Sequence, residues 1–171
     1  PVRVEQLLLD GGHKQVCFDD GQVFNCKLVI GADGAQSQVR QAANIGQYRE
    51  QYAQQAFVCT VSYQGEQEDI TWQSFTTHGP LAFLPLPDID GVHYASLVWY
   101  DFPEQVSRLQ GLEPLELKRE IQRTYPKDLP QIDQIIGRAK FPLVKSHAQS
   151  YIAEGLVLAG DAAHTINPLA G

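Results

Sequence analysis

Short apolar runs separated by polar turns open the chain. Residues 3–8 and 14–18 alternate apolar and polar side chains on either side of Asp10-Gly11-Gly12, which is a frequent hairpin turn sequence. Asp19-Asp20-Gly21 indicates a second turn directly after the hairpin. The pattern therefore predicts two antiparallel strands at the start of the chain.

A strand and a helix are expected next. Leu28-Val29-Ile30 is a continuous apolar run that ends in Gly31, and such a run is typical of a short strand buried on both faces. Ser37 is a favourable N-cap for a helix that we expect to reach about Asn44, with Gly46 as its stop.

The middle of the chain has a different pattern. Four runs rich in Val, Thr, Tyr, Phe and Trp are separated by Gly, Pro and Asp, and residues of these apolar and β-branched types favour strands. The four runs are residues 56–64, 70–76, 82–86 and 92–100. Together they predict an antiparallel sheet that forms one broad face of a cavity.

Helical patterns follow these runs. Asp101 before Pro103 indicates the start of one helix, and residues 114–125 form a second whose apolar side chains recur every four residues on one stripe. We expect a third helix over residues 130–136, stopped by Gly137. Residues 156–159 then repeat the pattern of a short buried strand, so the two ends of the chain are expected to form one domain around a separate middle.

Composition narrows the kinds of partner. The 171 residues are 43% hydrophobic and 19% charged, which is typical of a globular protein. A net charge of −7 without clustered Lys or Arg argues against nucleic acid and against electrostatic docking on an anionic membrane. No apolar run approaches the ~18 residues that span a bilayer. The three cysteines lack CxxC spacing, which indicates reduced cytosolic thiols and no metal site.

The first of two chemically informative motifs couples a strand to a capped helix. In residues 30–40, a glycine-containing turn with Asp33 and Gly34 leads into the helix that Ser37 caps. Backbone N–H groups at a helix start favour a phosphate, and glycine lets the backbone approach a ligand closely. An ordinary strand-to-helix turn explains the Asp-Gly pair alone, but the full span through Arg40 is more specific.

The second motif follows the last predicted strand. The strand stops at Gly160, and Asp161 comes next. Two alanines follow, and their small side chains would leave room for a bulky planar cofactor at the surface. The Asp161 carboxylate can accept hydrogen bonds from sugar-like hydroxyl groups. A helix cap is the other interpretation of Asp161, but it leaves the following Ala-Ala-His and Pro-x-x-Gly unexplained.

Both motifs resemble the paired fingerprints of the flavin-dependent aromatic hydroxylases, the para-hydroxybenzoate hydroxylase family. The sequence of residues 160–171, Gly-Asp-Ala-Ala-His-Thr-Ile-Asn-Pro-Leu-Ala-Gly, is typical of the ubiquinone-biosynthesis branch of that family. Residues 83–86 and 95–101 also resemble this branch, and within it the 2-octaprenyl-3-methyl-6-methoxy-1,4-benzoquinol hydroxylases.

The resemblance implies a cofactor-binding role for six residues. They are Asp33, Gly34 and Arg40 in the first motif and Gly160, Asp161 and Pro168 in the second. In the family, the first motif is associated with the FAD pyrophosphate and with the nicotinamide nucleotide. The Asp of the second motif holds the ribityl chain, and its Pro lies against the flavin ring. Because the flavin carries the chemistry, the resemblance implies no catalytic side chain and no metal.

The implied fold class is α/β (α+β), with parts of a Rossmann-like FAD-binding domain on either side of an antiparallel-sheet substrate domain. The expected boundaries are 1–48 and 151–171 for the FAD-binding parts and 49–150 for the substrate domain. The family's opening GxGxxG fingerprint and its helix after the second motif have no counterpart in this sequence. We therefore expect an internal fragment that is inactive alone and binds FAD weakly or not at all.

The implied reaction is hydroxylation of the ring of a prenylated benzoquinol, with FAD, NAD(P)H and dioxygen. The expected substrate-lining residues are Phe83, Leu84, Pro85 and Trp99. Side chains alternate along a strand, so Phe83 and Pro85 face one way and Leu84 the other, and only one set lines the site. The resemblance also implies a cytoplasmic protein, peripheral to the membrane, with other ubiquinone-biosynthesis proteins as partners.

Two other functions stay open. One is a related flavoprotein of different chemistry, such as an isoprenoid reductase or a halogenase. The other is a non-catalytic module that binds a quinone or a protein. In either case, we expect His78, His93 and His147 to be solvated or core residues and His164 to be mainly structural.

Overall fold

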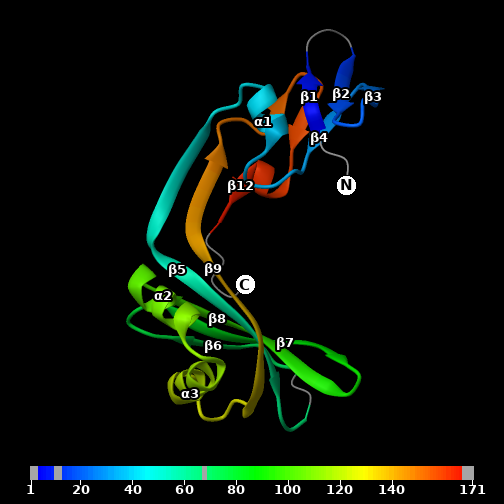
Figure 1. The fold of residues 1–171 in the computed structure, drawn as a ribbon. Helices are drawn as coiled ribbons and strands as arrows, with labels where there is room; N and C mark the ends of the chain where they lie inside the picture. Colours follow the sequence, from blue (N-terminus) through cyan, green and yellow to red (C-terminus); the bar gives the residue numbers. More distant parts are fainter. Residues whose placement is uncertain (1–3, 10–12, 67–68, 167–171) are drawn as a thin grey trace. The chain divides into compact units, whose positions relative to one another are not determined.

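The computed structural model describes residues 4–9, 13–66 and 69–166 (Figure 1). The chain divides into two compact units. The terminal unit combines the stretch that ends at Glu50 with the stretch that begins at Val144, and the central unit is Gln51–Leu143. The fold is mixed α/β with a large antiparallel sheet, as the sequence predicts. The assignment of a cofactor domain and a substrate domain to particular residues stays a prediction.

The chain begins with a three-stranded antiparallel sheet in the terminal unit. Its strands, in spatial order, are β1 (Val4–Leu8), β2 (Lys14–Phe18) and β3 (Val23–Cys26). The predicted hairpin is confirmed, although its turn at residues 10–12 lies outside the described residues. The second predicted turn is also confirmed: Gly21 has a φ of +83°, and the Gln22 N–H donates to the Asp20 carboxylate at 3.0 Å.

A second small sheet joins the two ends of the chain. Its strands, in spatial order, are β10 (Ile152–Ala153), β11 (Leu156–Leu158) and β4 (Val29–Gly31), with β11 and β4 parallel. The expectation that this first strand is buried on both faces is wrong for β4, because Ile30 is 63% exposed while both of its neighbours are buried. Side chains alternate along a strand, and only the face that carries Val29 packs into the core of this unit.

The helix α1 (Gln38–Ala42) follows β4 and is shorter than expected. Its predicted N-cap is confirmed, because the Ser37 hydroxyl accepts from the Arg40 N–H at 2.9 Å. The predicted stop at Gly46 is wrong. Asn44 takes the left-handed conformation, with a φ of +53°, and Asn is one of the few residues besides Gly that tolerates it.

A six-stranded sheet carries the middle of the sequence, in the strand order β12-β9-β5-β8-β7-β6. Its strands are β5 (Gln47–Tyr63), β6 (Trp72–Phe75), β7 (Pro80–Ile89), β8 (Val92–Asp101), β9 (Ile132–Ala148) and the short β12 (His164–Thr165). All four predicted β-prone runs are strands, and β6, β7 and β8 form antiparallel neighbours, as do β5 and β8.

Of the three helices predicted after the β-prone runs, two are confirmed. They are α2 (Pro103–Gly111) and α3 (Pro114–Thr124), each with proline at its start, and they lie near each other beside the sheet (Figure 1). The third, over residues 130–136, is wrong, because this segment begins β9. Three isoleucines among five residues favour a strand, and the Gln134 N–H donates to the Ser62 hydroxyl on β5 at 3.2 Å.

The two faces of the central sheet have different surroundings. One face packs against α2 and α3 and forms the main core, which includes Phe57, Val61, Phe83, Leu97, Trp99, Val106, Leu109, Leu117 and Ile121. The opposite face carries a smaller cluster that contains Ala82, Val98 and Tyr100, with Leu84 packed against it. Alternate residues of β7 and β8 therefore belong to different environments.

Candidate cofactor-binding site

The first motif turns its carboxylate onto its own helix. Asp33 Oδ2 accepts from the Gln38 N–H at 2.7 Å and from the Val39 N–H at 3.2 Å. Burial raises the pKa of Asp33, but hydrogen bonds from the Ser37 side chain and from nearby backbone N–H groups outweigh it and hold the pKa below its ordinary value. Because Ser37 accepts from the next N–H, the start of α1 already has acceptors within the chain. A phosphate would have to displace them.

Gly34 gives this turn its shape. Its φ is +83°, in the left-handed region that side-chain-bearing residues rarely adopt, and a Cβ there would meet open space. The backbone at Gly34 is therefore accessible to a ligand. The roles of Asp33 and Gly34 in cofactor binding stay predictions.

Arg40 joins the two motifs. The side chain is 5% exposed; its Nη1 donates to the Ala162 carbonyl at 2.9 Å and its Nη2 to the Ala35 carbonyl at 3.0 Å. The first acceptor lies 122 positions further along the chain. A rigid guanidinium fork suits this arrangement, since it presents several donors at fixed angles. The structure thus shows Arg40 as a brace between the two turns, whereas the resemblance implied direct contact with cofactor.

The second motif forms a short 3-10 turn, η1 (Gly160–Ala162), after β11. Gly160 has a φ of +57°. The N-cap position of this turn is Ala159, and no side chain caps it, so the interpretation of Asp161 as a cap is wrong. Asp161 is exposed, and no hydrogen bond or ion pair engages it within residues 4–9, 13–66 and 69–166. Its carboxylate is therefore available to the hydroxyl groups of a ligand.

The alanines of the second motif have a different role from the one expected. Ala162 and Ala163 are buried in the core of the terminal unit, with Val39 and Leu156, and do not form a low outer surface. Their small size lets the turn lie against that core. Pro168, the remaining predicted contact of the cofactor, lies outside the described residues.

Three aromatic rings gather beside this turn, and the sequence did not reveal them. His164 on β12 pairs with His147 on β9, and Tyr151 lies next to both. The Tyr151 hydroxyl and His147 Nδ1 are 2.7 Å apart, and the ring centroids lie 5.6–5.8 Å from one another. His147 and Tyr151 lie four residues apart, and the pairing of β9 with β12 adds His164 to them, which no pattern within one segment could have indicated.

The four predicted substrate-lining residues lie on both faces of the central sheet. Phe83 and Trp99 belong to the core under α2 and α3, with Phe83 1% exposed. Leu84 lies with the cluster on the opposite face, and Pro85 is half-buried. The structure therefore does not bring the four together. If the helix-covered face lined the site, Phe83 and Trp99 would contact the substrate; if the opposite face did, Leu84 would.

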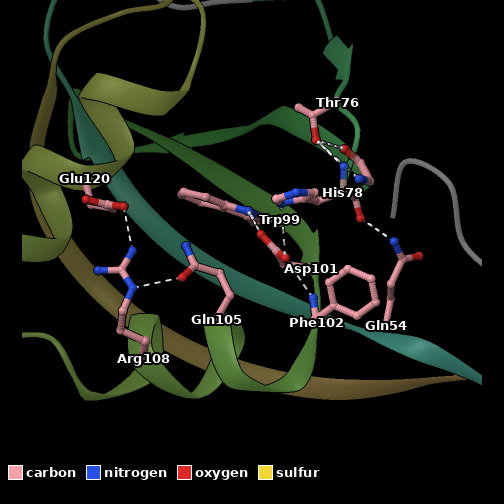
Figure 2. Close-up of polar contacts among 10 residues, drawn as sticks. Gln54, Thr76, His78, Trp99, Asp101, Phe102, Gln105, Arg108 and Glu120 are labelled. Atoms are coloured by element: carbon pink, nitrogen blue, oxygen red, sulfur yellow. Dashed lines mark hydrogen bonds and ion pairs between the residues drawn. The ribbon is translucent and has the colours of Figure 1, made fainter.

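A polar cluster at the end of β8 was also missed (Figure 2). The buried Asp101 accepts from the Trp99 indole N–H at 3.3 Å and from the Phe102 N–H at 2.8 Å, and His78 Nδ1 lies 3.7 Å from it. These contacts satisfy the indole donor and fix the start of α2. Asp101 before Pro103 is part of the sequence signal for this helix start, and its contact with the Phe102 N–H lies there, whereas its contacts with Trp99 and His78 could not be predicted from the sequence.

Comparison with known proteins decides the family. Residues 11–171 match the FAD binding domain family. The chain belongs to this family. It is 49% identical over 151 residues to 3-demethoxyubiquinol 3-hydroxylase of Escherichia coli K12, covering 88% of this chain and 37% of that protein. It is 33% identical over 171 residues to ubiquinone hydroxylase UbiL of Rhodospirillum rubrum, covering 100% of this chain and 39% of that protein.

Other relatives extend this group. Ubiquinone biosynthesis monooxygenase COQ6 of Drosophila melanogaster is 32% identical over 195 residues, covering 95% of this chain and 40% of that protein. The chain thus spans about two fifths of the length of these curated relatives. The family is that of FAD-binding monooxygenases, with ubiquinone-biosynthesis hydroxylases among its members, as the motifs predict.

Solved structures confirm the fold. PqsL of Pseudomonas aeruginosa, a probable FAD-dependent monooxygenase, matches with a TM-score of 0.75 at 23% identity, over 98% of this chain and 47% of that one. The flavin-dependent halogenase CmlS matches with a TM-score of 0.72 at 13% identity, over 98% of this chain and 32% of that one. A hydroxylase-type fold is therefore shared with a halogenase, so the fold alone does not choose the reaction.

FAD is the cofactor of this family, and the residues present fit its binding. The Asp161 carboxylate is exposed and without a partner in the described part of the chain, which suits an acceptor for ribityl hydroxyl groups. In that same part, no helix is long and apolar enough to cross a membrane, and no three metal-ligating side chains gather.

Proposed function

We propose that the protein containing this chain is an FAD-dependent monooxygenase that hydroxylates the benzoquinol ring of a polyprenylated ubiquinone precursor. One atom of dioxygen would enter the ring as a hydroxyl group and the other would leave as water, while NAD(P)H supplies a hydride, becoming NAD(P)⁺, and solvent supplies one proton. The observation that carries the proposal is the 49% identity, over 88% of this chain, to 3-demethoxyubiquinol 3-hydroxylase.

The flavin supplies the oxygen chemistry when it is bound, so the protein residues bind, orient and exclude water. The exposed Asp161 carboxylate would accept hydrogen bonds from the ribityl hydroxyl groups. Arg40 holds the turn that carries Asp161 against the first motif through the Ala162 carbonyl. By the resemblance, Pro168 would contact the flavin ring, and the left-handed conformations of Gly34 and Gly160 would let the backbone approach the cofactor.

The substrate-binding surface is proposed on the face of the central sheet opposite α2 and α3. Leu84 lies on this face, half-buried against the covered cluster of Ala82 and Val98, so its side chain presents apolar surface to a quinol ring or its tail. The other face is filled by the helices, and Phe83 and Trp99 are part of that packing. Leu84 is therefore the substrate-lining residue that we favour among the four.

A turnover assay tests the proposal. The full-length protein, supplied with FAD, NADPH and oxygen, should hydroxylate a prenylated benzoquinol and leave small soluble phenols unchanged. Chloride or bromide in the same assay should give no halogenated product, which separates the hydroxylase from the halogenase alternative. Efficient hydroxylation of 4-hydroxybenzoate, without activity on the prenylated ring, would refute the substrate assignment. NADPH oxidation without any oxygenated product would refute the monooxygenase assignment.

A further inference from the structure

The face of the central sheet opposite α2 and α3 carries two neighbouring rows of side chains. Each row takes one residue from β5, one from β8 and one from β7, paired directly across the strands. The first row is Val58, Val98 and Ala82, and the second is Thr60, Ser96 and Leu84. Because side chains alternate along a strand, Thr60 and Ser96 share the face of Val58 and Val98, which belong to the cluster there.

The second row combines one apolar side chain with two hydroxyl groups. Thr60, Ser96 and Leu84 are all half-buried, so part of each side chain is accessible, whereas Val98 and Ala82 of the first row are covered. Residues paired across antiparallel strands have Cβ atoms roughly 4.5–5.5 Å apart. The hydroxyl groups of Thr60 and Ser96 can therefore reach oxygen atoms of the same ring.

Neither hydroxyl group has a hydrogen-bond partner among the residues that the structure describes. Ser62, two residues further along β5, is different, because it is buried and its Oγ accepts from the Gln134 N–H at 3.2 Å. A Ser or Thr hydroxyl group donates one hydrogen bond and also accepts. The pair of Thr60 and Ser96 can therefore bind a hydroxyl, carbonyl or ether oxygen of a ligand.

The charge of the two rows limits the kind of ring they suit. All six side chains are uncharged. An anionic ring substituent would lose water on this surface without gaining an opposite charge from either row, and such desolvation is costly. A neutral substituent exchanges its hydrogen bonds to water for bonds to the hydroxyl groups at little cost. The rows therefore favour a neutral, oxygen-bearing ring over a benzoate.

We propose that Thr60 and Ser96 bind the ring oxygen atoms of the benzoquinol, beside Leu84, and so determine which rings the enzyme accepts. This role rests on the proposed hydroxylase function and adds to it the groups that recognise the ring. A site that hydrogen-bonds substrate oxygen atoms rejects an analogue without them, because its own polar groups then stay unpaired.

Equilibrium binding to the full-length protein, with oxidised FAD and without NADPH, tests this role in the absence of turnover. The probes are 2-prenyl-1,4-benzoquinol, kept free of oxygen, and prenylbenzene, which has the same tail and no ring oxygen. In calorimetric titration, the wild type should bind the quinol on the order of tenfold more tightly than prenylbenzene.

Matched variants separate hydrogen bonding from packing. Thr60→Val and Ser96→Ala should each weaken quinol binding about twofold to tenfold and leave prenylbenzene binding unchanged. Thr60→Ser keeps the hydroxyl group and should bind the quinol as the wild type does. Ser74→Ala should change neither probe, because Ser74 is a half-buried residue of β6 that pairs with Leu81 on the helix-covered face.

Unchanged quinol affinity in both Thr60→Val and Ser96→Ala would overturn the proposal. Equal weakening of the two probes, or no quinol binding by the wild type, would overturn it as well. Hydroxylation of the prenylated ring by the wild type is measured separately. If hydroxylation occurs while the variants bind the quinol normally, the proposed function stands and this role fails; if the variants lose only quinol binding but no hydroxylation occurs, the role stands and the proposed function fails.

Discussion

Replacing Arg40 should lower the free energy of unfolding of the FAD-free protein, because its main role is to hold two backbone turns together. Arg40→Met keeps an unbranched apolar stem but removes both donors, so the carbonyls of Ala162 and Ala35 lose their partners. Hydrogen bonds from a charged donor contribute about 1.5–3 kcal/mol each, and part of this is recovered because a charged group need no longer be buried. We therefore expect the free energy of unfolding to fall by about 2–4 kcal/mol.

The measurement is urea unfolding of the full-length protein after FAD has been removed, followed by circular dichroism. Arg40→Lys keeps the charge but cannot bridge two carbonyls with a planar fork, so it should recover only part of the loss. Arg119→Met, at an exposed position on α3, is the control and should have little effect. If Arg40→Met keeps the stability of the FAD-free protein and lowers only FAD affinity, Arg40 is a cofactor ligand and the brace is not its role.

Three further outcomes are expected. Asp161→Asn, which weakens an acceptor that has no partner in the described chain, should lower FAD affinity about fivefold to a hundredfold in fluorescence titration, with unchanged stability of the FAD-free protein; a loss of stability instead would mean a structural role. Asp33 has a pKa below its ordinary 3.8 in the fold, so its contribution to stability is complete above about pH 4 and is lost as the pH falls through the lowered value. Asp33→Asn should therefore reduce the acid sensitivity of unfolding between pH 5 and pH 2, and an unaltered pH profile would contradict this. Phe83→Ala should destabilise the central unit by about 3–5 kcal/mol. Leu84→Ala should reduce quinol turnover with a smaller change in thermal unfolding. A larger loss of turnover in Phe83→Ala, with the larger loss of stability in Leu84→Ala, would place the substrate on the helix-covered face.

Local patterns were sufficient for most of the strands and for two helices. The proline at the start of α2 and of α3, the alternation around the first hairpin and the Ser37 cap each act within a few residues, so the sequence shows them directly. The error at residues 130–136 has a different origin. Proline followed by polar and apolar residues suits a helix locally, but β9 is a strand of the large sheet, next to β5 in its strand order.

The contacts of the candidate site residues could not be predicted from the sequence, and their roles in FAD binding stay predictions. The two motifs identify Asp33, Arg40 and Asp161, but no sequence pattern shows which of them is already engaged. Asp33 bonds to its own helix, Arg40 bonds to a carbonyl far along the chain, and only Asp161 has no partner in the described residues. Whether these side chains are available to a ligand depends on tertiary contacts, which cannot be predicted from local patterns in a single sequence.

The pairing of β4 with β11 and the bond from Arg40 to Ala162 imply a particular order of folding. The terminal unit cannot close until residues after Val144 have been synthesised, because its last strands and its second motif lie there. Closing a flexible loop of the 122 positions between Arg40 and Ala162 costs about 4 kcal/mol of chain entropy beyond a constant. If the central unit folds first, β5 and β9 become neighbours in the sheet, and most of that entropy is lost before the terminal unit forms. Nascent chains should therefore acquire protease resistance in Gln51–Leu143 first, and mutations that slow this unit should delay the assembly of the cofactor-binding turns.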